Sequence, residues 1–478
     1  MKKMTTLLSV VMSALLTIAC GGSDGNDEPD VPKVQAPKLV SVSPADGTTD
    51  VPTGDVSVTL TYDQNITFLS ASTSQISISG GTVKSGRAIL KELLLTVNCP
   101  DKGATVSITI PKGLVKNTQG GEAEAASFSF TTTKPYEPDM SKISKTPLTS
   151  NPAAVKLYQY FYEQYGKKTI SSVMANVNWN NECAEKVYQL TGKYPAMNCY
   201  DFIHIYFSPA NWIDYTKIDP VKQWADAGGL VQLMWHFNVP ANEAGSTGTS
   251  DWNARPENTT FKGSNALKEG TWEHKVFYEQ MDKVVATLLK LQEAGIAATW
   301  RPFHEAAGNS MAKTYAGKAW FWWGDEGAEV FKQLWKTMYD YFKQKGINNL
   351  IWIWTTQNYG NDPSSYDQDT AWYPGDQYVD MVARDLYGRS AADNLEEFTQ
   401  IQQTYPSKMV ALGECGYNTS TKRDGAKIGD LWEAGAKWSH FMVWYEGNYG
   451  STGTMASDDW WKDAMKASCV VTRDQLPK

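Results

Sequence analysis

Cysteine and histidine are scarce in this chain of 478 residues, which has six cysteines and five histidines. The cysteines form no Cys-x-x-Cys pair and no cluster with histidine, so the sequence offers neither a disulfide scaffold nor a Cys/His zinc site. Sequence alone leaves open whether Cys183 and Cys199 pair, because pairing depends on their geometry. Nothing else in the sequence requires a metal or another cofactor, and we expect none.

An excess of positive charge is also absent, because the formal net charge is -8. Proteins that bind nucleic acids normally carry a basic patch, so we exclude nucleic acid as a partner. Hydrophobic residues make up 42% of the chain and charged residues 20%, which is typical of a globular protein, and the length predicts two or three folded units. The oligomeric state stays open, with a monomer as the default.

The N-terminal segment is typical of an exported protein. Two lysines precede an apolar run over residues 7–19, which predicts a signal peptide over residues 1–19. Cys20 follows directly, and residues 17–20 resemble the lipobox whose cysteine becomes the acylated N-terminus of bacterial lipoproteins. An ordinary secretion signal with an incidental cysteine is the alternative. Beyond this segment no apolar run is long enough to span a membrane.

Residues 20–36 are polar and acidic, which predicts a flexible tether behind the lipid. The resemblance of residues 17–20 to a lipobox implies a lipoprotein of the cell envelope. We expect it to be held at the outer membrane and exposed on the cell surface, with the periplasmic side as the alternative. The membrane is then a partner only through the lipid anchor on Cys20.

Alternation of apolar and polar residues with period two predicts strands over residues 37–134. Turn signals between them favour an immunoglobulin-like β-sandwich. All 19 tryptophans of the chain lie at or after Trp179, so this domain contains none. Because it lacks these rings for stacking on a ligand, we interpret the domain as a spacer and not as a ligand-binding module. Residues 135–150 contain several prolines and serines and predict a linker. The alternating stretches are Val40–Val42, Val56–Tyr62, Ile76–Ile78, Val106–Ile110 and Phe128–Phe130.

Residues 151–474 alternate between apolar strand patterns and helical patterns, which predicts the α/β class and a (β/α)8 TIM barrel. Over 274–295 and 329–346, apolar residues recur every three or four positions, and Gly295 and Gly346 follow as C-terminal caps. A doubly wound sheet is the runner-up, but the glycine-rich loop it usually carries after the first strand is missing. The eight predicted strands are Thr169–Val177, Ala196–Ile203, Leu230–Phe237, Ala297–His304, Leu350–Thr355, Met381–Tyr387, Met409–Cys415 and His440–Tyr445.

Polar residues follow these strands at their carboxyl ends, where the active sites of such barrels lie. Glu305 ends the fourth strand and Glu414 the seventh, so we expect the two carboxylates to face each other. A retaining glycosidase needs such a pair, about 5–5.5 Å apart, in which one group protonates the leaving oxygen and the other attacks the anomeric carbon. His236, His304 and Arg301 end neighbouring strands, and a purely structural role is the alternative for each.

Three motifs in the expected order resemble glycoside hydrolase family 26. Residues 300–305 (Trp-Arg-Pro-Phe-His-Glu), followed by the aromatic run 320–324, are similar to the strand-four signature of that family. Residues 413–416 resemble its strand-seven segment, and residues 235–238 resemble strand three. The resemblance covers about residues 150–470.

This resemblance implies that Glu305 is the acid/base and Glu414 the nucleophile, with Tyr387 as a hydrogen-bond partner of Glu414. His236, His304 and Trp444 would contact the sugar just before the cleaved bond. The long gap between Glu305 and the aromatic run leaves open which aromatic ring fills which sugar position. The remaining implied substrate-binding residues are Arg301, Asp385, Trp252 and Trp320.

The family most often implies cleavage of β-1,4-mannosidic bonds by double displacement, so the expected partner is a β-linked polysaccharide such as mannan, galactomannan or glucomannan. The same mechanism on mixed-linkage β-glucan or β-xylan is the first alternative. A surface glycan-binding lipoprotein without activity is the alternative of another class, and the presence of both carboxylates speaks against it. The sequence does not decide between endo and exo action.

Overall fold

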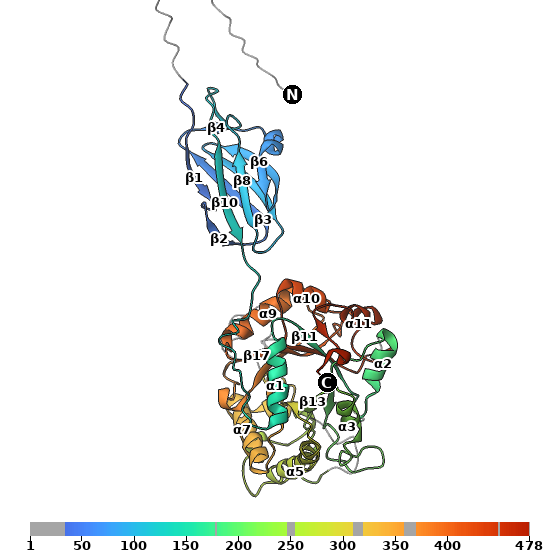
Figure 1. Cartoon of the computed structure of the whole chain (residues 1–478). Helices are drawn as coiled ribbons and strands as arrows, with labels where there is room; N and C mark the ends of the chain where they lie inside the picture. Colours follow the sequence, from blue (N-terminus) through green and yellow to red (C-terminus); the bar gives the residue numbers. More distant parts are fainter. Residues whose placement is uncertain are drawn as a thin grey trace, which may run out of the picture. The chain divides into compact units, whose positions relative to one another are not determined.

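Eight parallel strands close into a barrel in which each strand pairs with the next along the chain (Figure 1). The first of them, β11, pairs with both β12 and β18, which completes the ring and confirms the predicted (β/α)8 fold. A short strand, β19 (Val470–Val471), pairs with β11 from outside the ring. The eight strands are β11 (Thr169–Met174), β12 (Met197–Asp201), β13 (Leu230–Trp235), β14 (Ala298–Pro302), β15 (Leu350–Thr356), β16 (Met381–Tyr387), β17 (Met409–Gly416) and β18 (His440–Val443).

This computed structural model describes residues 34–176, 179–245, 254–308, 319–357, 370–447 and 450–477. The chain divides into two compact units, residues 1–134 and 135–478. In the described ranges, no helix combines the length and the apolar character that crossing a membrane requires. Cys183 and Cys199 are both free, buried thiols, so they do not pair.

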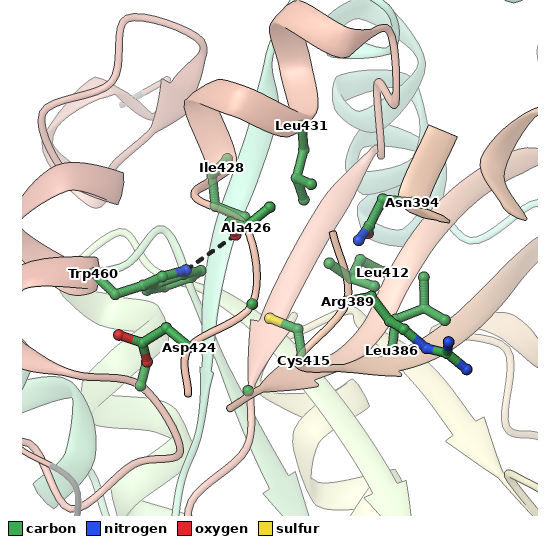
Figure 2. Close-up of a pocket in the computed structure, with 13 residues that line it drawn as sticks. Leu386, Arg389, Asn394, Leu412, Cys415, Asp424, Ala426, Ile428, Leu431 and Trp460 are labelled. Atoms are coloured by element: carbon green, nitrogen blue, oxygen red, sulfur yellow. Dashed lines mark hydrogen bonds between the residues drawn. The ribbon is translucent and has the colours of Figure 1, made fainter. Parts of the chain in front are cut away.

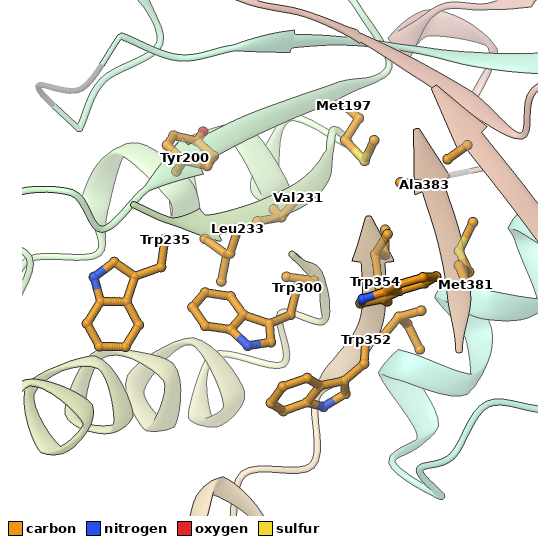
Figure 3. Close-up of a cluster of buried hydrophobic side chains, with 14 of the residues drawn as sticks. Met197, Tyr200, Val231, Leu233, Trp235, Trp300, Trp352, Trp354, Met381 and Ala383 are labelled. Carbon is orange, nitrogen blue, oxygen red and sulfur yellow. The ribbon is translucent and has the colours of Figure 1, made fainter. Parts of the chain in front are cut away.

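Helices surround the strands of the barrel (Figure 1). Their apolar faces pack on the sheet and bury large aromatic side chains, among them Trp300 of β14 and Trp352 of β15 (Figure 3). On α7, the ring of Phe342 lies 5.9 Å from Trp300, and the ring of Trp335 lies 5.7 Å from Trp352. The helices are α1 (Pro152–Gln164), α2 (Glu182–Thr191), α3 (Asp219–Asp226), α4 (Gly263–Ala266), α5 (Trp272–Glu293), α6 (Trp322–Asp325), α7 (Ala328–Gln344), α9 (Ala391–Thr404), α10 (Ile428–Ala434) and α11 (Asp458–Ala464).

The two helices with predicted apolar stripes are α5 and α7, and the prediction is confirmed for both. Thr271 caps α5 at its start by accepting a hydrogen bond from the backbone N–H of His274. Gly295 and Gly346 follow the two helices with φ of 73° and 86°, a left-handed conformation that glycine adopts without strain. These ends fix where the chain turns back into β14 and β15.

The N-terminal unit is a β-sandwich, which confirms the predicted class. One sheet has the order β1-β3-β7-β6 and the other β2-β10-β8-β5, with apolar side chains such as Leu60, Val97 and Ile108 buried between them. The sequence patterns predicted β1, β3, β5, β8 and β10 and missed the other five strands of this unit, β2, β4, β6, β7 and β9. The strands are β1 (Leu39–Ser43), β2 (Thr48–Val51), β3 (Gly54–Tyr62), β4 (Ile66–Thr67), β5 (Ser77–Ser79), β6 (Thr82–Ile89), β7 (Glu92–Cys99), β8 (Thr105–Ile110), β9 (Lys116–Asn117) and β10 (Ala126–Thr132).

The segment 135–150, expected as a linker, packs against the barrel. Ile143 is buried in the barrel core, and the backbone N–H of Leu148 donates to the carboxylate of Asp380 at 2.7 Å. The hydroxyl of Thr149 donates to the backbone carbonyl of Asn348 at 2.6 Å. This segment therefore belongs to the C-terminal unit.

Candidate active site

A cavity of about 900 Å³ opens at the carboxyl ends of the barrel strands. Glu305, just after β14, and Glu414, in β17, both line it. The structure thus brings the two predicted carboxylates to one place. The other predicted site residues that line the cavity are His236, His304, Trp320, Tyr387 and Trp444.

Three carboxyl groups meet beside this cavity. Oxygen atoms of Glu305, Asp385 and Glu414 lie within 4.8 Å of one another. A retaining glycosidase needs its two carboxyl groups about 5–5.5 Å apart, whereas an inverting enzyme separates them by about 6.5–9.5 Å to admit a water molecule. The spacing of Glu305 and Glu414 therefore fits the retaining geometry.

Arg301 holds two of these carboxylates from behind. Its fully buried guanidinium donates through Nη1 to both oxygens of Asp385, at 3.2 and 3.0 Å, and to Oγ1 of Thr355 at 3.2 Å. Its Nη2 donates to Oε1 of Glu414, and the Tyr387 hydroxyl donates to Oε2 of Glu414 at 2.5 Å. Both oxygens of Glu414 are thus hydrogen-bonded, which fixes the orientation of the group.

The same three carboxylates are the one acidic cluster in the described ranges that is close enough to share a cation. The guanidinium of Arg301, however, already contacts Asp385 and Glu414 and uses the oxygen atoms that a metal would need. The arrangement therefore fits a charge-paired cluster better than a metal site.

Backbone conformation explains how Glu305 reaches the cavity. Strand β14 ends at Pro302, and both Phe303 and Glu305 have positive φ, of 48° and 52°. Residues with a side chain rarely adopt this region, and such strain concentrates at functional sites where the surroundings hold it. Here the indole N–H of Trp323 donates to the backbone carbonyl of His304 at 2.9 Å and helps to hold the turn.

A β-bulge places Glu414 next to Asp385. Arg384 of β16 pairs with Leu412 of β17, but the next residue, Asp385, pairs with Glu414, so Gly413 is the extra residue. A Cβ atom at position 413 would lie 2.7 Å from Oδ1 of Asp385. Glycine therefore permits the close approach of the two strands that the carboxylate cluster requires.

Burial raises the pKa values of two of the three carboxyl groups. Burial raises the pKa of Glu305 well above its ordinary value, and the negative charges of Asp385 and Glu414 raise it further. Burial also raises the pKa of Asp385 to about 7, although Arg301 opposes the shift. The raised pKa favours the protonated form of Glu305, which is the form that a general acid needs.

Two histidines complete the wall beside Glu414. Asp201, at the end of β12, accepts hydrogen bonds from the backbone N–H of His236 at 2.9 Å and from its Nδ1 at 2.5 Å. Burial opposes the charged form of His236, but the Asp201 carboxylate outweighs it and raises the pKa of this histidine. Burial lowers the pKa of His304 well below its ordinary value, and the charges of His236 and Arg301 add to this effect.

Aromatic rings border the histidines. The ring of Trp444 lies 5.5 Å from that of His236, and Phe321 lies 5.6 Å from His236 and 5.1 Å from His304. Trp320 is 37% exposed on the rim of the cavity. These rings offer apolar surfaces of the kind on which a sugar ring packs.

The remaining predicted site residues differ in their surroundings. The side chains of Arg301 and Asp385 are completely buried and contact Glu414 or each other, so they lie behind the cavity wall and do not reach the open space. Trp252 lies outside the described residues. The sequence patterns assigned no role to Asp201 or Phe321, although the position of Asp201 at a strand end was a usable signal.

A second cavity, of about 20 Å³, lies on the outer side of β17 (Figure 2). Cys415, Leu412 and Leu386 line it, and the indole of Trp460 donates to the backbone carbonyl of Ala426 at 3.2 Å beside it. This space admits about one water molecule. It is too small for a substrate, and the candidate site is the large cavity that Glu305 and Glu414 line.

A (β/α)8 barrel with two close carboxyl groups at the ends of its fourth and seventh strands is the arrangement of a retaining glycoside hydrolase. The chain belongs to glycosyl hydrolase family 26, whose model matches residues 148–475. A model of the bacterial Ig-like domain matches residues 33–132. Both predicted domain types are thereby confirmed.

Curated relatives agree with this family. A mannan endo-1,4-beta-mannosidase of Thermothelomyces thermophilus is 30% identical over 336 residues, which are 69% of this chain and 62% of the relative. Mannan endo-1,4-beta-mannosidase B of Piromyces sp is 28% identical and shares 70% of this chain and 54% of its own length. The chain thus spans less than two thirds of each of these relatives.

Solved structures are similar to the barrel. The family 26 domain of an endo-beta-mannanase/endo-beta-glucanase from Prevotella bryantii is 52% identical, with a TM-score of 0.66, and the match covers 70% of this chain and 100% of that one. A beta-mannanase from a symbiotic protist of the termite Reticulitermes speratus, solved with a gluco-manno-oligosaccharide, is 30% identical, with a TM-score of 0.55, and the match covers 70% of this chain and 98% of that one.

Proposed function

We propose that the chain hydrolyses β-1,4-mannosidic bonds in mannan-type polysaccharides and retains the anomeric configuration. The observation that carries this proposal is the close approach of Glu305 and Glu414, within 4.8 Å, at the ends of β14 and β17 of a family 26 barrel. The relatives whose names specify mannan supply the substrate class.

In the first step, Glu414 attacks the anomeric carbon while Glu305 gives its proton to the departing glycosidic oxygen. Arg301 and Tyr387 hold the attacking carboxylate in place. Because Glu305 is buried beside negative charges, it enters this step protonated. The product is a glycosyl ester on Glu414 and a free chain end.

In the second step, a water molecule attacks the anomeric carbon and breaks the ester. The esterified Glu414 has lost its charge, so the pKa of Glu305 falls and this residue can accept the proton of the water. Glu305 is then protonated again and Glu414 is again a carboxylate. His236, Trp444 and Phe321 form the wall against which the reacting sugar lies.

The pH dependence of the reaction reports on Asp385. Replacing it with asparagine (Asp385→Asn) removes a negative charge that raises the pKa of Glu305, so that pKa falls. Glu305 then loses its proton at lower pH, and we expect the alkaline limb of the kcat/KM profile to move to lower pH. The measurement is kcat/KM on mannohexaose across pH, with the melting temperature as a check on folding. An alkaline limb that stays in place or moves upward would contradict this role.

The substrate class is tested by measuring the reducing ends that the chain releases from mannan, glucomannan, barley β-glucan and xylan, with Glu414→Ala as the blank. Release from mannan and glucomannan supports the proposal, and the product lengths separate endo from exo action. Release only from β-glucan or xylan keeps the mechanism and overturns the substrate. No release from any of the four favours a glycan-binding protein.

We further propose that Cys20 carries a lipid that anchors the chain to the outer membrane, with residues 20–36 as the tether. The basis is the lipobox-like sequence at residues 17–20, which lies outside the described residues. In a bacterial host grown with a radiolabelled fatty acid, the full chain should become labelled and sediment with membranes, and Cys20→Ser should do neither. Equal labelling or equal sedimentation of the two proteins would refute the anchor.

A further inference from the structure

The loop between β12 and α3 carries an exposed aromatic ring. Trp212 is 45% exposed, although tryptophan is usually largely buried in a folded protein. Its ring is supported from within the loop by His204 at 5.1 Å and by Phe207 at 6.0 Å. The residue before it in the chain, Asn211, is exposed and polar.

This loop is fixed to the barrel at many points. Nζ of Lys283, on α5, donates to the backbone carbonyls of Tyr206 at 2.7 Å and Ser208 at 3.1 Å. The hydroxyl of Thr287, one turn further along α5, donates to the carbonyl of Tyr215 at 3.0 Å. A ring held by such a loop binds a ligand with little loss of conformational entropy.

The loop is also continuous with the cavity. Asp201 and Ile203 line the cavity, and His204 follows them directly in the chain and contacts the Trp212 ring. The Tyr215 hydroxyl donates to the backbone carbonyl of Asp201 at 2.8 Å, which ties the far side of the loop to the same strand end. Trp212 therefore lies on a loop that continues directly from the cavity wall at the end of β12.

We propose that Trp212 is a binding platform for a distal sugar unit of the bound polysaccharide, outside the cavity in which the bond is cleaved. A polysaccharide is longer than a cavity of about 900 Å³, so its further units must leave along the rim. The exposed indole can pack on the apolar face of a pyranose ring. Polar residues beside the indole can contact the hydroxyl groups at the edge of the same sugar ring. This inference rests on the proposed function.

The test compares long and short substrates. Full-length Trp212→Ala should lose roughly threefold to tenfold in kcat/KM on mannohexaose, mainly through KM, and almost nothing on mannotriose, because only the longer chain reaches the platform. Trp212→Phe should keep most of the activity. The matched control is Tyr188→Ala, which removes a 42%-exposed ring on α2 that stacks on Tyr194, and it should leave both substrates unaffected.

An equal loss on both substrates, or no loss on either, would overturn the platform, and so would an equal loss in Tyr188→Ala. If wild type cleaves no mannan, the proposed function fails. The platform is then tested separately, by comparing the migration of wild type and Trp212→Ala in affinity gels that contain mannan, barley β-glucan or xylan. If one of these glycans retards wild type but not Trp212→Ala, the platform is supported. Equal migration of the two proteins in all gels overturns it.

Discussion

Replacing the nucleophile, Glu414→Ala, is expected to lower kcat on mannan by at least about 10⁴-fold, because no other group can form the glycosyl ester. The fold should survive, because Arg301 keeps its two hydrogen bonds to Asp385. The measurement is kcat on mannohexaose together with the melting temperature. Glu305→Ala should lower kcat by about 10²- to 10⁴-fold, which is the usual range when a general acid/base is removed.

Added azide distinguishes the roles of the two glutamates on an activated substrate, 2,4-dinitrophenyl β-mannobioside. In Glu305→Ala, azide should attack the glycosyl ester on Glu414 and give the β-glycosyl azide, because it needs no general base. In Glu414→Ala, azide should attack the anomeric carbon of the substrate directly, from the face opposite the leaving group, and give the α-glycosyl azide. The reverse pair of products would exchange the two assignments.

Removing the buried cation, Arg301→Met, is expected to lower stability by about 3–5 kcal/mol, because the buried carboxylates of Asp385 and Glu414 lose their partner. Without Arg301, the pKa of Asp385, which burial already raises to about 7, should rise further. A carboxyl group whose pKa is raised in the folded state stabilises the fold at low pH, and this contribution is lost as pH rises through the folded pKa. The melting temperature of the variant should therefore approach that of wild type as pH falls.

The activity of Arg301→Met should also collapse, because Glu414 loses the hydrogen bond that orients it for attack. Arg384→Met is the matched control, since Arg384 is equally buried but pairs with Glu397 of α9 on the outer side of β16, at 2.6 Å. It should lose stability and keep most of its kcat. Wild-type stability and kcat in Arg301→Met would show that the cation does not organise the site.

The barrel was predictable because most of its buried strands are rich in apolar residues, and because the two longest helices, α5 and α7, carry an apolar stripe and end just before a glycine. Strand ends were harder to predict. The fourth strand was expected to reach His304 but ends at Pro302, because Phe303 and Glu305 adopt left-handed backbone conformations. Sequence patterns do not reveal such conformations, since the surrounding structure imposes them.

The site was predictable as a set of strand-end residues but not as a network of contacts. The motifs named Glu305 and Glu414, while the partners that prepare them depend on tertiary geometry. Arg301 looked equally suited to bind substrate or to bridge carboxylates, and only its complete burial favours the second. The bulge at Gly413 and the hydrogen bond between Asp201 and His236 likewise depend on the pairing of strands that lie far apart in the sequence.

The most direct test of the retaining pair is proton NMR of the anomeric region while the full chain hydrolyses mannohexaose. Double displacement through Glu414 predicts that the new reducing ends appear first as the β anomer, with the α anomer growing in later by mutarotation. Initial appearance of the α anomer would mean inversion by a single displacement and would contradict the roles given to Glu305 and Glu414.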